Sequence, residues 1–159
     1  MSDYHLNTGD AAPEIDLPTW PEGSLTLSDY RGQWVIVYFY PKDNTPGCTT
    51  ESCAFRDALA DFSEANAKII GVSRDSVKSH GRFTEKQALN FPLIADTEEA
   101  LCKAFDVIQL KKNYGKEYLG VERSTFIINP KGIVAHIWRK VRVKEHVETV
   151  LETLKILQA

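Results

Sequence analysis

Cys48 occupies the position in this chain that most favours chemistry. It follows the apolar run 34–40 and comes shortly before a stretch with helical spacing. A thiol at a strand-to-helix junction feels the unpaired N–H groups and the positive end of the helix, which favour thiolate over thiol. Cys53 follows five positions later. The pair predicts thiol chemistry, in which any product formed at Cys48 has a partner nearby.

The segment before Cys48 supplies further polar groups. Pro41 ends the apolar run, and Thr45 offers a hydroxyl that both donates and accepts hydrogen bonds. Pro46 and Gly47 allow a tight turn, so that backbone N–H groups can face a bound oxygen atom. These residues predict a pocket for a small polar substrate.

Arg123 is the candidate cation for stabilising a thiolate. A helix terminus contributes only about 1 to 2 kcal/mol, so a fixed charge should add to it. Arg123 opens an apolar strand, where an arginine is not expected to point into the core without an anionic partner. A surface arginine at a sheet edge is the alternative that the residues alone leave open.

Two further residues have structural interpretations. Glu51 lies in the first turn of the expected helix, where a carboxylate favours the helix, so helix capping is its expected role. Cys102 lies among apolar residues on a short predicted helix and is expected to be a small buried hydrophobe.

Length and composition limit the possible classes of protein. The chain has 159 residues, 43% of them hydrophobic and 26% charged, which fits one soluble domain over 1–159. Its longest apolar run is far below the ~20 residues of a membrane span. A net charge of −3 with dispersed lysines and arginines predicts no nucleic-acid surface. Three cysteines do not suit a secreted disulfide framework, and no leader pattern is present, so we expect a cytoplasmic protein.

The elements that position these residues alternate along the chain. Apolar runs predict strands, and residues at a spacing of three to four predict helices. The expected order is an N-terminal hairpin (14–17 and 24–27), a strand (34–40), a helix (49–66), a strand (67–73), a helix (77–88), a strand (91–95), a short helix (97–105), a lysine-rich surface connection (107–118), a hairpin (123–128 and 133–139) and a closing helix (143–157). This order predicts a thioredoxin-like α/β fold, with a central mixed β-sheet flanked by helices.

The motif Pro-x-x-x-Thr-x-x-Cys, filled by Pro41, Thr45 and Cys48, resembles the peroxiredoxins. The stretch YFYPKDNTPGCTTE over 38–51 is most similar to the bacterioferritin-comigratory, or Q, type, and the likeness covers nearly the whole chain. The resemblance implies thiol-dependent reduction of hydrogen peroxide and organic hydroperoxides without metal, flavin or haem. It implies that Cys48 is the peroxidatic cysteine, that Thr45 and Arg123 hydrogen-bond the transition state, and that Pro41 shapes the pocket.

The resemblance also bears on the resolving cysteine. Some peroxiredoxins carry it on the helix after the second strand, but here that helix has Thr84 and no cysteine, which leaves Cys53 as the candidate. The implied enzyme is an atypical 2-Cys peroxidase whose intramolecular disulfide is reopened by thioredoxin, glutaredoxin or a similar dithiol. Because the chain ends at Ala159 without a cysteine-bearing tail, a monomer is expected.

Helix geometry adds a requirement for this pairing. Residues five apart on a helix have Cα atoms roughly 8 to 9 Å apart, whereas a disulfide needs them within ~7 Å. We therefore expect the segment 48–56 to be helical when reduced and unwound when oxidised.

Three rival functions use the same residues. A zinc site does not fit the Cys48–Cys53 spacing, and the four histidines are scattered along the chain. A general disulfide oxidoreductase should carry Cys-x-x-Cys at this junction. A redox sensor that passes oxidation to a partner protein would use the same Cys48, and the sequence leaves that alternative open.

Overall fold

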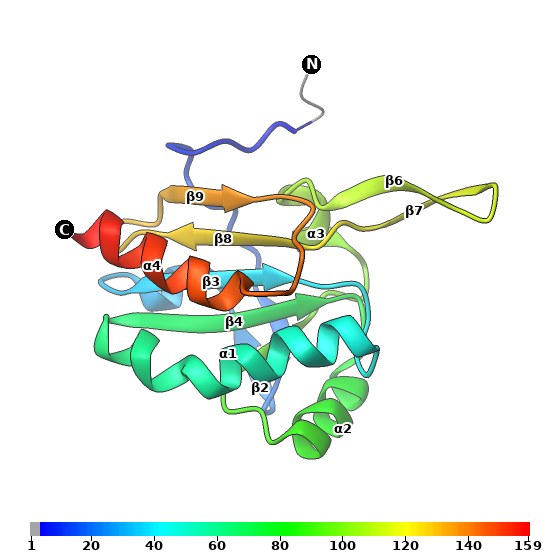
Figure 1. Cartoon of the computed structure of the whole chain (residues 1–159), viewed down its shortest axis with the longest axis horizontal. Helices are drawn as coiled ribbons and strands as arrows, with labels where there is room; N and C mark the ends of the chain where they lie inside the picture. The colour runs from blue at the N-terminus through cyan, green and yellow to red at the C-terminus, as the bar shows by residue number, and fades with distance from the viewer. Residues whose placement is uncertain (1–3) are drawn as a thin grey trace.

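The fold is built around a mixed sheet of seven strands (Figure 1). The structure, a computed structural model, describes residues 4–159. The sheet runs in the order β2-β1-β5-β4-β3-β8-β9, and β6 and β7 form a separate hairpin. The strands are β1 (Leu17–Trp20), β2 (Gly23–Leu25), β3 (Trp34–Phe39), β4 (Ala67–Ser73), β5 (Leu93–Ala95), β6 (Ile108–Asn113), β7 (Lys116–Val121), β8 (Ser124–Ile128) and β9 (Val134–Trp138). The helices are the 3-10 helix η1 (Leu27–Tyr30), α1 (Pro46–Glu64), α2 (Val77–Gln87), α3 (Ala100–Ala104) and α4 (His146–Gln158).

Strand β3 lies at the centre because its side chains are apolar on both faces. It pairs in parallel with β4 and antiparallel with β8. Val37 and Phe39 pack into one apolar cluster, whereas Ile36 and Tyr38 pack into the other. The absence of hydrophobic alternation in the run 34–40 therefore reflects burial on both sides.

The helices cover both faces of the sheet. Helices α1, α2 and α4 contribute to the cluster that contains Tyr38, and Figure 1 shows α1 and α4 on one side of the sheet. Helix α3 and the N-terminal segment pack on the opposite face. The loop from β3 to α1 and the start of β8 meet at one end of the sheet, because Phe39 pairs with Ser124.

Two boundaries differ from the sequence prediction near the start of the chain. The N-terminal hairpin uses Leu17–Trp20 rather than 14–17 as its first strand, because β1 also pairs with β5. Helix α1 begins at Pro46, three residues before the predicted start. Thr45 is the extended N-cap, and proline suits the first helical position because the missing N–H would have no partner there.

The segment 107–118 lies mostly at the surface as predicted, but the prediction of a connection without strands is wrong. The segment forms the β6–β7 hairpin, which projects from the body (Figure 1). Tyr114 and Gly115 both have positive φ, as in the tight turns that match strand twist. This hairpin could not be predicted from the sequence pattern, because lysines occupy its exposed strands and a tyrosine occupies its turn. Leu110 and Leu119 face each other across it and are 58% and 65% exposed.

Candidate active site

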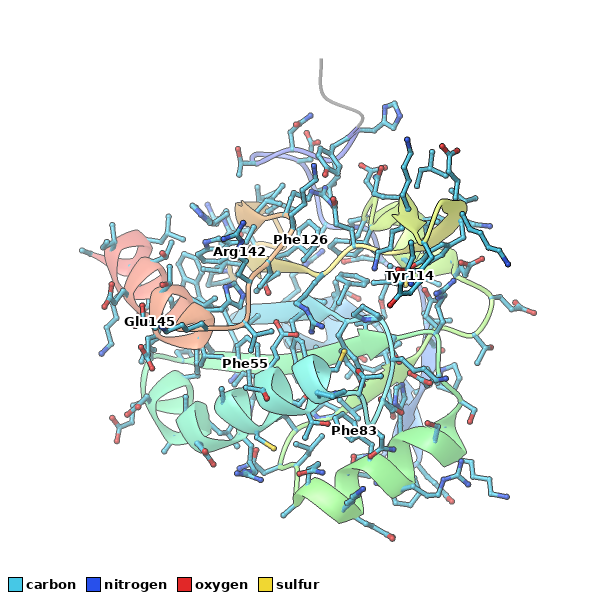
Figure 2. The ribbon with its side chains drawn as sticks, turned by 45° about the vertical axis from the view of Figure 1, so that its right-hand side comes forward. Phe55, Phe83, Tyr114, Phe126, Arg142 and Glu145 are labelled. Carbon is cyan, nitrogen blue, oxygen red and sulfur yellow. The ribbon has the colours of Figure 1, made fainter. Side chains whose placement is uncertain are left out.

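Cys48 lies in the first turn of α1 and is fully buried. It packs in the apolar cluster formed by α1, α2, α4 and one face of the sheet. In Figure 2, Phe55 of α1 and Phe83 of α2, both members of this cluster, lie on the same side of the sheet. The N–H of Cys48 is among the first four of the helix, which have no partner inside it. The sulfur is therefore placed where a helix terminus favours negative charge.

Arg123 connects this sulfur to a second acidic group. It comes immediately before β8, whose pairing with β3 brings it next to the start of α1. Its Nη2 donates to Cys48 Sγ at 3.3 Å, and its Nη1 donates to Glu51 Oε1 at 2.7 Å. A Cβ atom at Gly47 would lie 3.2 Å from Nη2, so the glycine leaves room for the guanidinium.

Glu51 is a buried ion-pair partner, and the predicted capping role is wrong. Its side chain is fully buried, and Oε2 has no hydrogen-bond partner among residues 4–159. Burial raises the pKa of Glu51 to about 7, although the Arg123 charge and hydrogen bond act to lower it. Burial acts to lower the pKa of Arg123, but the neighbouring Glu51 and Cys48 raise it above its ordinary value. One guanidinium therefore serves a carboxyl group and a thiol group together.

Thr45 and Pro41 lie in the loop that leads into α1. The Thr45 hydroxyl donates to the Lys42 carbonyl oxygen at 2.8 Å, and its own oxygen can still accept a hydrogen bond. Pro41 lines a cavity of about 380 Å³ on the surface beside this loop. Its other lining residues are Lys42, Arg74, Asp75, Thr97 and Glu99. Cys48 does not line this cavity.

Cys53 is on the same helix as Cys48, and both are free thiols. Cys53 is half-buried, and its Sγ donates to Gln87 Oε1 at 3.5 Å. Because α1 is continuous through both positions, their Cα atoms are too far apart for a disulfide.

Cys102 is separated from this pair. It is fully buried in the cluster on the opposite face of the sheet. Burial, followed by the nearby Asp96, raises the pKa of its thiol well above the ordinary range. A thiol in such surroundings stays protonated and is a poor nucleophile.

Asp43 and His80 are both buried, and neither had a predicted role. His80 Nδ1 lies 2.8 Å from Asp43 Oδ2, a contact that joins the loop 41–45 to α2. The available signal was a histidine three positions before Phe83 on an otherwise polar helix, but only the structure shows that it is buried and what it contacts.

A model of the AhpC/TSA family matches residues 8–137. The chain is 53% identical over 150 residues to peroxiredoxin Bcp of Bacillus subtilis, covering 94% of this chain and 96% of the relative. It is 54% identical over 146 residues to peroxiredoxin Bcp of Xanthomonas campestris, covering 91% of each. The chain therefore belongs to the AhpC/TSA family, within which its relatives are Bcp, or Q-type, peroxiredoxins.

Solved structures agree with this assignment. The bacterioferritin comigratory protein of Xanthomonas campestris, studied for alkyl peroxide reduction, matches with a TM-score of 0.91 and 49% identity, covering 99% of this chain and all of the other. A mutant of PrxQ from Xylella fastidiosa matches with a TM-score of 0.93 and 46% identity, covering 98% and 99% of the two chains. The predicted peroxiredoxin resemblance and thioredoxin-like fold are thus confirmed. Within residues 4–159, no helix is long and apolar enough to cross a membrane.

Proposed function

We propose that this chain reduces hydrogen peroxide and organic hydroperoxides through Cys48, with Cys53 as the resolving cysteine. The observation that carries the proposal is the 3.3 Å contact from Arg123 Nη2 to Cys48 Sγ in the first turn of a helix. Helix terminus and guanidinium both stabilise negative charge on the sulfur. The relatives and the motif supply the class of substrate.

The first chemical step is attack of the Cys48 thiolate on one peroxide oxygen. A sulfur–oxygen bond forms while the oxygen–oxygen bond breaks, and the departing oxygen takes up a proton and leaves as water or an alcohol. Arg123 donates to the peroxide oxygens and stabilises the charge that develops as this bond breaks. The Thr45 oxygen accepts a hydrogen bond from the peroxide hydroxyl and orients it, and Pro41 shapes the approach. Cys48 is thereby oxidised to a sulfenic acid.

The second step closes the cycle through Cys53. Its thiolate attacks the sulfenic sulfur, a disulfide forms and the sulfenic oxygen leaves as water. A dithiol reductant of the thioredoxin or glutaredoxin type then reopens the disulfide. The enzyme works as a cytoplasmic monomer without a metal or an organic cofactor.

Serine variants of the three cysteines test these roles in a peroxide-reduction assay coupled to a dithiol reductant. Cys48→Ser should lose all activity. Cys53→Ser should consume about one equivalent of peroxide and then stop unless an outside thiol resolves the product. Cys102→Ser should turn over normally, because this thiol lies in the other cluster.

Two results would contradict the proposal. Activity in Cys48→Ser would remove the peroxidatic assignment. Full turnover in Cys53→Ser together with failure in Cys102→Ser would reverse the resolving assignment. Slow turnover with reductant but fast disulfide transfer to another protein would instead identify a redox sensor.

A further inference from the structure

The loop that carries Pro41 and Thr45 is anchored by a buried carboxylate. Asp43 lies in the middle of this loop and is only 4% exposed. Its Oδ1 accepts from the Tyr40 hydroxyl at 2.6 Å. Its Oδ2 accepts from the Ser79 hydroxyl at 2.8 Å and lies 2.8 Å from His80 Nδ1. Three side chains, one from the residue after β3 and two from α2, therefore converge on one carboxylate.

The position of hydrogen atoms in this cluster follows from its acceptors. His80 is fully buried, and its Nε2 lies 2.9 Å from the Ile94 carbonyl oxygen. A carbonyl oxygen only accepts, so Nε2 must carry a hydrogen. Nδ1 lies 2.8 Å from Asp43 Oδ2, so the imidazole ring bridges the loop carboxylate and the backbone of β5. A buried charge is tolerated when it is paired in this way, and removing one partner is costly.

The backbone of Asp43 provides a second anchor. Its N–H donates to Asp75 Oδ2 at 2.9 Å, and the same oxygen accepts from the Ser73 hydroxyl at 2.6 Å. Ser73 ends β4, and His80 belongs to α2. The loop 41–45 is thus attached both to the sheet and to a helix.

Helix α2 holds α1 by different contacts at its other end. Gln87 accepts a weak hydrogen bond from Cys53 Sγ, and its carbonyl oxygen accepts from Arg56 Nη1 at 2.6 Å. Both contacts go to the segment that must unwind if Cys48 and Cys53 are to pair. Among residues 4–159, the Asp43 side chain makes its hydrogen bonds with Tyr40, Ser79 and His80, none of which belongs to that segment.

We propose that Asp43 and His80 are positioning residues, which hold the loop 41–45 in place while the start of α1 unwinds and rewinds. This latch, the Asp43–His80 pair, acts on the reaction through Pro41 and Thr45. The inference rests on the function proposed for Cys48. The two steps of the cycle then depend on different parts of the molecule. The latch fixes the geometry of peroxide attack, whereas disulfide formation depends on the mobility of α1.

Asp43→Asn and His80→Gln test the latch in single-turnover experiments with reduced protein. Leu154→Ala is the control, because Leu154 is as buried as His80 but lies on α4, in the apolar cluster that contains Tyr38 and outside the Asp43 cluster. Both latch variants should be oxidised by peroxide about 10- to 100-fold more slowly, since a displacement of about 1 Å at a site can cost this much. Their rate of disulfide formation should stay within about threefold of wild type. The control should lose stability to urea while keeping both rates.

Hydrogen exchange of the reduced proteins supplies a readout that does not depend on cysteine reactivity. Amides 42–45 should exchange at least about tenfold faster in both latch variants than in Leu154→Ala. If amides 42–45 exchange at the wild-type rate in both latch variants, the proposed latch is overturned even if Cys48 is the peroxidatic residue. Equal slowing of oxidation and disulfide formation would also overturn it. Conversely, faster loop exchange in a protein whose Cys48 is inert to peroxide would support the latch and contradict the proposed function.

Discussion

At the scale of single residues, the geometry of Arg123 sets what the site can do. Its planar guanidinium reaches Glu51 with one nitrogen and Cys48 with another, and its side chain is only 16% exposed. A lysine offers a single compact charge and cannot hold this fork geometry. The orientation of the cation is therefore as important as its charge.

Arg123→Lys should lower the second-order rate constant for oxidation of Cys48 by about 100-fold, because loss of one aligned donor at a developing charge typically costs this much. Rapid mixing of reduced protein with hydrogen peroxide measures the constant. Arg139→Lys is the matched control: Arg139 is also part-buried, but it donates to the carbonyl oxygens of Phe105 and Asp106. The control should stay within about threefold of wild type. An equal loss in both variants would show a general effect on packing.

The site could be predicted from sequence only where spacing carries the information. Cys48 stood out by its place at a strand-to-helix junction, and Arg123 by its charge at the start of an apolar strand. The partner of Arg123 could not be predicted, because a carboxylate in a first helical turn normally stabilises the helix terminus in water. Only the fold shows that Glu51 is buried, since this depends on how β8 packs against α1.

At the scale of elements, α1 must serve two opposing requirements. Its intact first turn places Cys48 beside Arg123, but the same regular geometry keeps Cys48 away from Cys53. The contacts of Cys53 and Arg56 with Gln87 hold this part of α1 against α2. Forming the disulfide therefore requires that helical turns and these contacts are lost together.

Oxidation should remove hydrogen-exchange protection from amides 48–56 while amides 57–64 of the same helix stay protected. The physical reason is that the unwound segment gives up its helical hydrogen bonds, whereas Phe62 remains in the apolar cluster. Mass spectrometry of peptides from reduced and peroxide-treated protein measures this difference. Cys53→Ser treated in the same way is the control and should keep the reduced pattern. Identical protection in both states of the wild-type protein would contradict the expected unwinding.

Strands and helices could be predicted from sequence where their side chains are strongly buried, and the prediction failed where they are mostly exposed. The run 67–73 coincides with β4 because nearly every residue of it is buried. The β6–β7 hairpin was not predicted because its strands are mostly exposed. Polar and apolar residues there do not alternate between a buried and an exposed face. The early start of α1 was missed because a proline was interpreted as part of a turn rather than as the first residue of a helix.

At the scale of the whole molecule, burial of His146 makes the stability of the fold depend on pH. His146 is 6% exposed, and its Nε2 lies 2.8 Å from Thr125 Oγ1. Burial, assisted by the Arg123 charge, lowers the pKa of His146 to about 4. The folded state therefore binds this proton less tightly than the unfolded state, whose histidine titrates near 6.5. The contribution is full above pH 6.5 and is lost as the pH falls towards 4.

His146→Gln should remove this pH dependence and still allow a hydrogen bond to Thr125. Between pH 7 and pH 4, the wild type should lose about 3 kcal/mol more unfolding free energy than the variant, since the free energy of binding a proton changes by about 1.36 kcal/mol for every tenfold change in affinity. Urea unfolding of the reduced proteins at both pH values measures the difference. His136→Gln is the control, because His136 lies on β9 and is only half-buried. Parallel pH profiles for wild type and His146→Gln would refute the prediction.

The sheet also decides which disulfides can form. Three thiols allow three pairings, but Cys102 belongs to α3, on the far side of the sheet from Cys48. A pairing that includes Cys102 would require the central strands to separate, whereas Cys48 and Cys53 need only part of one helix to unwind. The sheet thus keeps Cys102 apart from the other two thiols, so we expect oxidation to yield one intramolecular disulfide, Cys48–Cys53.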